Sequence, residues 1–263
     1  MKKLSKTQLL VLLCIILISI ITSIIIFYPK TSQDGIRLSK LSETSTSGNA
    51  YKIQIQGELA YTLNLDNAYF RTYNISNPNL PQLLDSLQLN ETTHDMQIVG
   101  ERAFVASRYA GLHIINIEDP MNLTKLGFFA CESIEAIYID NSIAYIGSHY
   151  EYLQILNISD DTNPVEINFP LVFENDIHGL GILDKYLLAA GSQGLFIFNI
   201  TNSTNPILIN QFSDIGAFSH FVLHGNYMFV PQWTQGLKVL NITNLNDIEE
   251  ITASYATTTP VDI

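Results

Sequence analysis

The chain has 263 residues, of which 47% are hydrophobic and only 14% are charged, and its formal net charge is −12. This length and apolar content allow one large domain or two ordinary ones with a sizeable core. Four of the 13 basic residues lie within the first 30 positions, which hold no acid, so the remainder is strongly acidic. An acidic surface repels phosphate backbones, and the composition therefore argues against nucleic-acid binding.

The first predicted element is a transmembrane helix over residues 9–28, an uncharged run that reads LLVLLCIILISIITSIIIFY. At about 1.5 Å per residue it spans about 30 Å, the thickness of a bilayer's hydrocarbon core. Lys2, Lys3 and Lys6 precede it, which places residues 1–8 in the cytoplasm and the rest outside the cell membrane. We expect an uncleaved, single-pass signal anchor followed by a short linker at 29–35. The alternative, a cleaved signal peptide, would be shorter and would end in small residues.

After the linker the chain repeats itself. Five segments share an apolar residue, then Asn, then Ile, and their Asn residues are spaced 42, 41, 42 and 42 positions apart. The five residues are Asn74, Asn116, Asn157, Asn199 and Asn241. A repeat of this length is typical of propellers, solenoids and other arrays.

Each copy has the same internal order of short apolar runs. In one copy a first run, Met96–Val99, is followed by Ala103–Ala106 and then by Gly111–Ile115, which opens on a Gly-Leu turn. A weaker fourth run closes each unit, for instance Ile207–Phe212. The runs are rich in β-branched and aromatic residues, and no stretch after residue 30 has a sustained helical period. Four strands in about 42 residues predict an all-β protein built from propeller blades.

The third run of the unit also carries a family resemblance. Residues 112–120 (LHIINIEDP) and 195–201 (LFIFNIT) resemble the signature strand of the LVIVD-repeat family of β-propeller proteins, which occurs on bacterial and archaeal cell surfaces. The resemblance covers residues 36–263. Asn replaces the signature Asp in all five copies, and because either side chain caps a turn with an oxygen, the implied fold is unaffected. The resemblance implies an architecture and almost nothing about activity.

The two ends of the repeat region predict a further, incomplete blade. Ile36–Leu41 resembles a fourth strand, and Pro260–Ile263 resembles the start of a first strand. We therefore expect five complete blades, a partial sixth, and a propeller at 36–263 that is truncated at its C-terminus. The alternative is a five-bladed ring whose terminal strands extend one sheet edge.

Histidines recur near the start of the first strand of the repeat, at His94, His178 and His220, and Glu135 holds this position in another copy. First strands line a propeller's channel, so these side chains could meet near one mouth. Three imidazoles and a carboxylate suit a transition metal. The alternative is a structural role in which the histidines bond to backbone between blades. No cofactor is expected.

Four aromatic residues fall in predicted loops between second and third strands: Tyr109, Tyr150, Tyr152 and Trp233. An exposed aromatic rim would suit a protein or glycan partner, and the alternative is that these rings only cover blade edges.

Seven Asn-X-Ser/Thr sequons are present, and four of them are the repeat Asn itself, where turn formation already explains both residues. The other three, Asn90, Asn122 and Asn202, are the glycosylation candidates.

Motifs for catalytic nucleophiles, zinc proteases and phosphate loops are absent from the sequence. The leading interpretation is therefore a membrane-anchored binding or scaffolding module outside the cytoplasm. The alternative is an envelope hydrolase or oxidoreductase, metal-assisted or not, with its site in the channel mouth.

Overall fold

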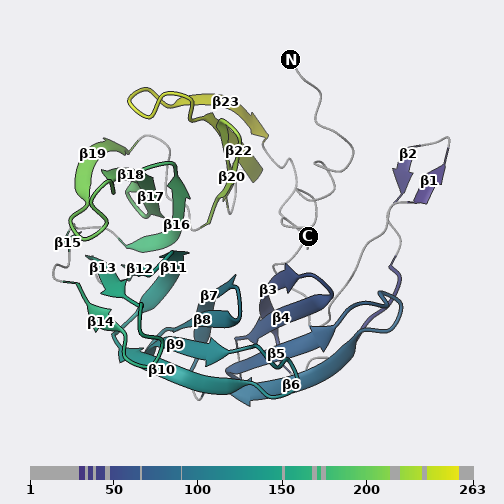
Figure 1. The fold of residues 1–263 in the computed structure, drawn as a ribbon. Coiled ribbons are helices and arrows are strands. Elements are labelled where there is room, and N and C mark those ends of the chain that lie inside the picture. The colour runs from purple at the N-terminus through teal and green to yellow at the C-terminus, as the bar shows by residue number, and fades with distance from the viewer. Residues whose placement is uncertain are drawn as a thin grey trace. The chain divides into compact units, whose positions relative to one another are not determined.

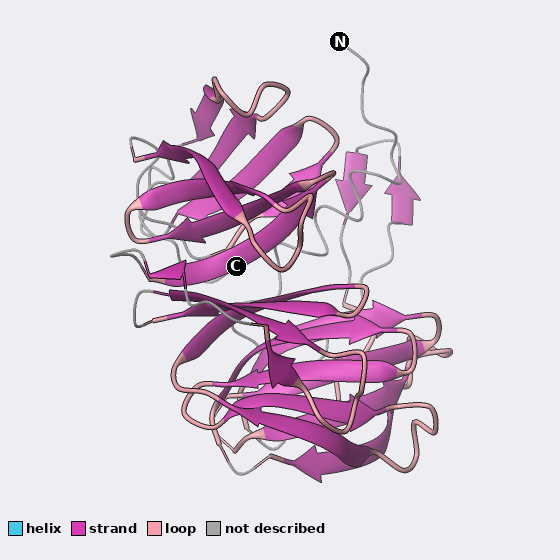
Figure 2. Ribbon diagram, turned by 60° about the vertical axis from the view of Figure 1, so that its left-hand side comes forward, coloured by secondary structure: helices cyan, strands magenta, loops and turns pink. Residues whose placement is uncertain are grey.

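The computed structural model of the protein describes residues 30–32, 35–37, 40–44, 48–65, 67–89, 91–149, 152–167, 171–172, 176–213, 220–232 and 236–254. Strands and loops make up this part of the chain, and it contains no helix (Figure 2). None of these residues belongs to a helix long and apolar enough to cross a membrane. The expected anchor at 9–28 and the expected strand at Pro260–Ile263 lie outside the described residues.

Apart from one short hairpin, the described strands form five antiparallel sheets in which strands follow one another in chain order (Figure 1). The hairpin pairs β1 (Lys30–Ser32) with β2 (Gly35–Arg37). Sheet 1 contains β3 (Ala50–Gln56), β4 (Leu59–Asn64), β5 (Tyr69–Asn74) and β6 (Gln82–Gln88). Sheet 2 contains β7 (Thr93–Val99), β8 (Arg102–Ser107), β9 (Gly111–Asn116) and β10 (Thr124–Ala130).

Sheet 3 contains β11 (Ile134–Asp140), β12 (Ile143–Ser148), β13 (Tyr152–Asn157), β14 (Val165–Glu166) and β15 (Leu171–Val172). Sheet 4 contains β16 (Ile177–Leu183), β17 (Tyr186–Gly191), β18 (Gly194–Asn199) and β19 (Ile207–Phe212). Sheet 5 contains β20 (Val222–His224), β21 (Tyr227–Gln232), β22 (Gly236–Asn241) and β23 (Glu249–Ser254).

The predicted four-strand unit is confirmed in these five sheets. Sheet 3 departs from it in one detail, because β14 and β15 both pair with β13 and divide the outer edge between them. Of the strand expected over Ile36–Leu41, the structure has Gly35–Arg37 as a strand, and it pairs with β1 in a sheet of its own.

The loop between the first and second strand has two residues in every sheet, and its first residue has a positive φ each time. These first residues are Gly57, Gly100, Asn141, Asp184 and Gly225, with φ between 53° and 61°. Gly reaches this conformation without strain, and Asn and Asp tolerate it better than other side chains. The periodic Gly, Asn and Asp residues therefore set the position of a tight hairpin turn.

The repeat Asn closes a turn at the end of the third strand, as the sequence predicts. The Asn199 Oδ1 atom accepts hydrogen bonds from the Thr201 backbone N at 2.9 Å and from the Thr201 Oγ1 at 2.7 Å. A second turn of the same kind follows, in which Asn202 Oδ1 accepts from Thr204 N at 3.2 Å. The corresponding first-turn bonds occur at Asn74, Asn116, Asn157 and Asn241. The motif is thus explained by local side-chain to backbone bonding.

The Gly that opens the third strand is required by close contact with the fourth strand. Gly194 has a φ of +113°, and a Cβ placed on it would lie 2.0 Å from the carbonyl oxygen of Phe212. Gly111 has a φ of +136° and the same clash with the carbonyl oxygen of Phe129. The Gly-Leu turn is therefore a site where two backbones approach too closely for any side chain.

The chain divides into two compact units, which are described separately. The first comprises Met1–His94, Asn116–Thr124 and Asp262–Ile263, and the second comprises Asp95–Ile115 and Lys125–Val261. In the first unit Ala60 and Tyr73 of sheet 1 are buried. Ile53 of β3 and Ile75, the residue that follows β5, pack against them. Asp85 Oδ2 also accepts a hydrogen bond from the backbone N of Leu123 at 2.7 Å.

In the second unit, sheets pack face to face and share their cores. Leu195 and Ile197 of β18 lie in a core with residues of sheet 5. Phe196 and Phe198 of the same strand lie in a core with residues of sheet 3. Successive side chains of a strand point to opposite faces, so both faces of the middle strands β17 and β18 are buried. This explains why the middle strands read as unbroken apolar runs.

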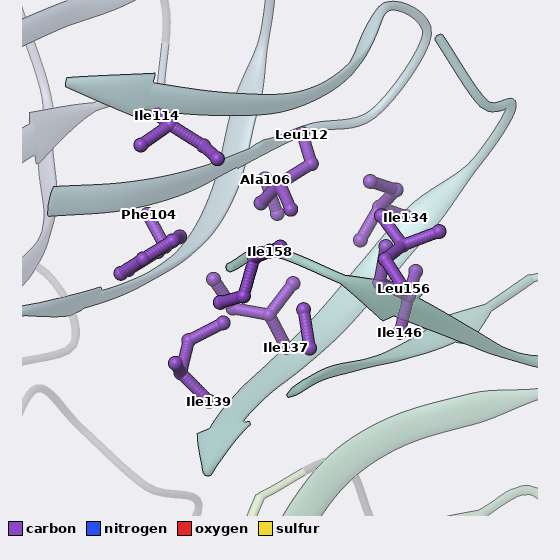
Figure 3. Close-up of a cluster of buried hydrophobic side chains, with 11 residues drawn as sticks. Phe104, Ala106, Leu112, Ile114, Ile134, Ile137, Ile139, Ile146, Leu156 and Ile158 are labelled. Atoms are coloured by element: carbon purple, nitrogen blue, oxygen red, sulfur yellow. The ribbon is translucent and has the colours of Figure 1, made fainter. Parts of the chain in front are cut away.

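Sheets 2 and 3 share a third core in the same way. Phe104, Leu112 and Ile114 from sheet 2 pack against side chains of sheet 3 that include Ile137 and Ile146 (Figure 3). Hydrogen bonds reinforce the contact between their first strands. Asp95 Oδ2 accepts from Ile137 N at 2.9 Å, and Gln97 Oε1 accepts from Ile139 N at 2.7 Å. Sheets 2 and 3 are therefore joined by polar contacts as well as by apolar burial.

Candidate functional site

The site begins at a bulge near the start of the first strand. In sheet 3 the pairing passes from Ile134↔Ser148 to Ala136↔Gly147, which leaves Glu135 as an extra residue. In sheet 4 it passes from Ile177↔Gly191 to Gly179↔Ala190, which leaves His178 as the extra residue. Sheet 1 has the same irregularity at Tyr51. A bulge redirects the side chain of its extra residue, so each of these sheets has one bulged residue near the start of its first strand.

A second repeated position lies directly after the second strand. His149 follows β12, and its backbone N donates to the carbonyl oxygen of Ser133 at 3.0 Å. Arg108 holds the same position after β8 in sheet 2. In the second unit, the side chain that follows the second strand of one sheet meets the bulge residue of the next sheet.

Sheets 3 and 4 bring three potential metal ligands together in this way. His149, Asp176 and His178 each offer a ligand atom, and these atoms all lie within 4.8 Å of one another. His149 Nδ1 is 3.4 Å from Asp176 Oδ2, and the rings of His149 and His178 have centroids 6.2 Å apart. Asp176 directly precedes β16, and His178 is the bulged second residue of that strand. We call these three residues the His-Asp-His cluster.

Sheets 2 and 3 form an ion pair at the equivalent junction. Arg108 Nη2 lies 3.1 Å from Glu135 Oε1, and the Glu135 side chain is 9% exposed. Burial of this kind strengthens the attraction because solvent screens it less.

The protonation of His178 reflects all of these neighbours. Burial lowers the pKa of His178, which favours its neutral form. The charges of Glu135 and Asp176 raise this pKa, and those of His149 and Arg108 lower it further. The net shift of this pKa is downward, and the neutral imidazole that it favours is the form that binds metals.

The structure places the four predicted metal-site residues in different surroundings. Only His178 belongs to the His-Asp-His cluster. Glu135 is close enough to influence the pKa of His178 and pairs with Arg108. His94 lies in the first unit, with its ring 5.9 Å from that of Tyr51. His220 is exposed ahead of β20.

Among the predicted aromatic residues, Tyr109 is a loop residue as expected and is 64% exposed. The guanidinium carbon of Arg108 lies 5.7 Å from the centre of its ring, close enough for a cation–π contact. Tyr152 was expected in a loop but begins β13 and pairs with Val172, because the strand starts earlier than its apolar run suggests. Tyr150 and Trp233 lie outside the described residues.

The glycosylation candidates differ in their local structure. Asn202 is exposed, but its Oδ1 is engaged in the second turn of its repeat, with Thr204 Oγ1 at 2.8 Å. Asn122 is exposed, and its backbone N donates to the Asp119 carbonyl oxygen at 3.0 Å. Asn90 lies outside the described residues.

Sequence reasoning missed His149 and Asp176. A signal for His149 existed, because it follows Arg108 by 41 positions, nearly the length of the repeat. Asp176 carries no such signal, since Ser133 occupies its position in the preceding repeat. The cluster therefore depends on two repeated positions, those of His149 and His178, and on one local exception, Asp176.

Comparisons with known proteins agree with this description. The LVIVD repeat matches residues 92–129, 137–169 and 216–257. No curated protein matches the chain in sequence.

Solved structures resemble it at low identity. One is a protein from Lactobacillus plantarum, with 13% identity, a TM-score of 0.72, and coverage of 90% of this chain and 80% of that one. BamB from Moraxella catarrhalis has 14% identity, a TM-score of 0.57 and coverage of 89% and 75%. A chain of a nidogen/laminin complex has 9% identity, a TM-score of 0.62 and coverage of 90% and 92%. At these identities the likeness concerns the fold alone. Three stretches of this chain thus match the LVIVD repeat, and its predicted resemblance to the LVIVD-repeat propeller family is confirmed.

Proposed function

We propose that this chain is a membrane-anchored LVIVD-repeat propeller that acts outside the cytoplasm as a binding or scaffolding module for a protein partner. The observation that carries the proposal is the Arg108–Tyr109 pair. An exposed Tyr is held beside an Arg whose own position is fixed by Glu135. Tyr and Arg are the residue types most often found at the energetic centres of protein interfaces.

The framework behind this pair favours recognition over chemistry. Both faces of the middle strands of sheet 4 are buried, and the turn after its third strand is formed by Asn199 and Thr201 themselves. A loop held on such a framework loses little conformational freedom when it binds, which favours affinity. One of the structures with a similar fold is a chain of a nidogen/laminin complex, which supports a protein-binding role.

The tether is part of the proposal. The uncharged run at 9–28, preceded by three Lys residues, supports an N-terminus in the cytoplasm and a propeller at 36–263 on the other side. We expect the full chain to stay in the membrane fraction after alkaline carbonate extraction, and a chain without residues 1–28 to be released. Release of both chains would contradict the anchor.

The binding role can be tested by cross-linking and affinity capture with the full-length chain in its native membrane. We expect a specific protein to be captured by the wild type and lost with Tyr109→Ala. Tyr227→Ala is the matched control, because Tyr227 is also exposed, at 43%, but stands at the start of a second strand and not after its end.

Two outcomes separate the alternatives. Equal capture by the wild type and both variants would refute the role of Tyr109. Capture that disappears after enzymatic deglycosylation of the extract would indicate a glycan as the recognised group.

A further inference from the structure

We propose that the His-Asp-His cluster of His149, Asp176 and His178 binds a divalent first-row transition-metal ion such as Zn²⁺ across the junction between sheets 3 and 4. The proposal is independent of the binding role above.

The donor set suits this class of ion. Imidazole nitrogen and carboxylate oxygen are ordinary ligands of zinc, and a site with two His and one acid leaves positions open for water or substrate. The carboxylate adds a negative charge to the site, which hard or borderline cations favour. Thiolate-dependent ions have no ligand here, because the described Cys131 is not part of the cluster.

The geometry requires only small movements. Zinc bonds of about 2.0–2.2 Å in a tetrahedron place ligand atoms about 3.3 Å apart. His149 Nδ1 and Asp176 Oδ2 are already 3.4 Å apart, and the largest separation in the cluster is below 4.8 Å. Side-chain rotation of His149, which is 42% exposed, can close the remainder without displacing a strand.

The charges around the cluster affect how well it could bind a cation. Arg108 is a positive charge that acts on His178 and would repel a metal ion. Its guanidinium is 3.1 Å from Glu135, so the carboxylate offsets that charge. The chain as a whole carries −12, which raises the local concentration of cations.

The residue types at the two repeated positions explain why this junction, and not the neighbouring one, has the ligands. Sheets 2 and 3 place Arg and Glu at the two repeated positions, whereas sheets 3 and 4 place His and His there. Asp176 adds the third ligand because it directly precedes β16, two residues before the bulge. One junction thus forms a salt bridge and the next has the composition of a metal site.

The test uses the full-length chain in detergent, stripped with EDTA and dialysed against buffered Zn²⁺. We expect the wild type to hold one zinc ion per chain by metal analysis. His149→Ala, Asp176→Asn and His178→Gln should each weaken binding at least tenfold. Co²⁺ should give visible d–d absorption in the wild type that each variant loses. Thermal unfolding of the metal-free variants verifies that they remain folded.

His220→Ala is the control, because His220 is exposed and outside the cluster. His94→Gln tests the ligand set suggested by the repeat pattern alone. Retained zinc in both variants supports the His-Asp-His cluster. The proposal is overturned if the folded wild type holds no stoichiometric zinc. It is also overturned if His94→Gln abolishes binding while His149→Ala leaves it unchanged.

Discussion

The Gly that opens the third strand offers the most direct test of the repeat architecture. In Gly194→Ala, the new Cβ would lie 2.0 Å from the Phe212 carbonyl oxygen, whereas real Cβ contacts stay above 3.0 Å. The strands β18 and β19 must therefore separate by about 1 Å at this point, where Leu195 pairs with Phe212. Loosening one or two backbone hydrogen bonds costs about 1–2 kcal/mol, and the φ of +113° adds about 1–3 kcal/mol for a residue with a side chain.

We therefore expect Gly194→Ala to lower the free energy of unfolding by about 2–5 kcal/mol. For a domain of this size that corresponds to a fall in Tm of about 4–20 °C. The assay is thermal unfolding of the full chain in detergent, followed by far-ultraviolet circular dichroism.

Gly225→Ala provides the matched control. Gly225 also has a positive φ, of +56°, but a Cβ there would meet nothing within 4 Å. For Gly225→Ala only the cost of placing a side chain at a positive φ remains, which is about 1 kcal/mol and lowers Tm by about 2–4 °C. If the two variants lost the same Tm, the close backbone approach would not be the reason for Gly194, and the argument would be wrong.

Three further changes test other features described above. Asn199→Ala removes the acceptor of two turn bonds and should cost about 1–2 kcal/mol in urea unfolding, whereas Asn199→Asp keeps an acceptor oxygen and should cost less than half of that. Burial, and to a smaller degree the charge of Lys125, lowers the pKa of His113 to about 4. Since the unfolded chain binds this proton near pH 6.5, the protein should lose about 2 kcal/mol of stability between pH 7 and pH 5, and His113→Leu should lose that much less. Burial chiefly raises the pKa of the Cys131 thiol to about 12, so at pH 8 this thiol should react with iodoacetamide far more slowly than in urea, as followed by intact mass in a Cys14→Ser background.

Much of the fold could be predicted because its determinants are local. The repeat Asn, the Gly before the third strand and the Gly, Asn or Asp of the hairpin turn each act within a few residues or across one strand pair. Their spacing therefore survives in the sequence. Apolar runs indicated the strands for the same reason. The outer edge of sheet 3 was harder to predict, because two short strands, β14 and β15, form it in place of one.

The candidate site was only partly predictable, because it depends on contacts between different repeats. His149 and His178 are 29 positions apart; His149 follows β12 of sheet 3, and His178 lies in β16 of sheet 4. The repeat pattern indicated His178 and Glu135 because they occupy equivalent positions in two repeats. It did not indicate the residues that they contact, which are His149 and Arg108. Two bulges redirect these side chains, and no bulge could be inferred from the residue types alone.

The alternation of faces in β18 has an evolutionary consequence. Leu195 and Ile197 contact one neighbouring sheet and Phe196 and Phe198 the other, so a repeat carries both halves of its interfaces within six residues. Duplicating such a repeat in the gene copies both of its packing faces together, and these faces are complementary to each other. A substitution in one repeat then affects the packing of the adjoining repeats only, as in a one-dimensional array with nearest-neighbour interactions. Loops at the strand ends can then diverge one repeat at a time, which leaves Arg and Glu at one junction and two His residues at the next.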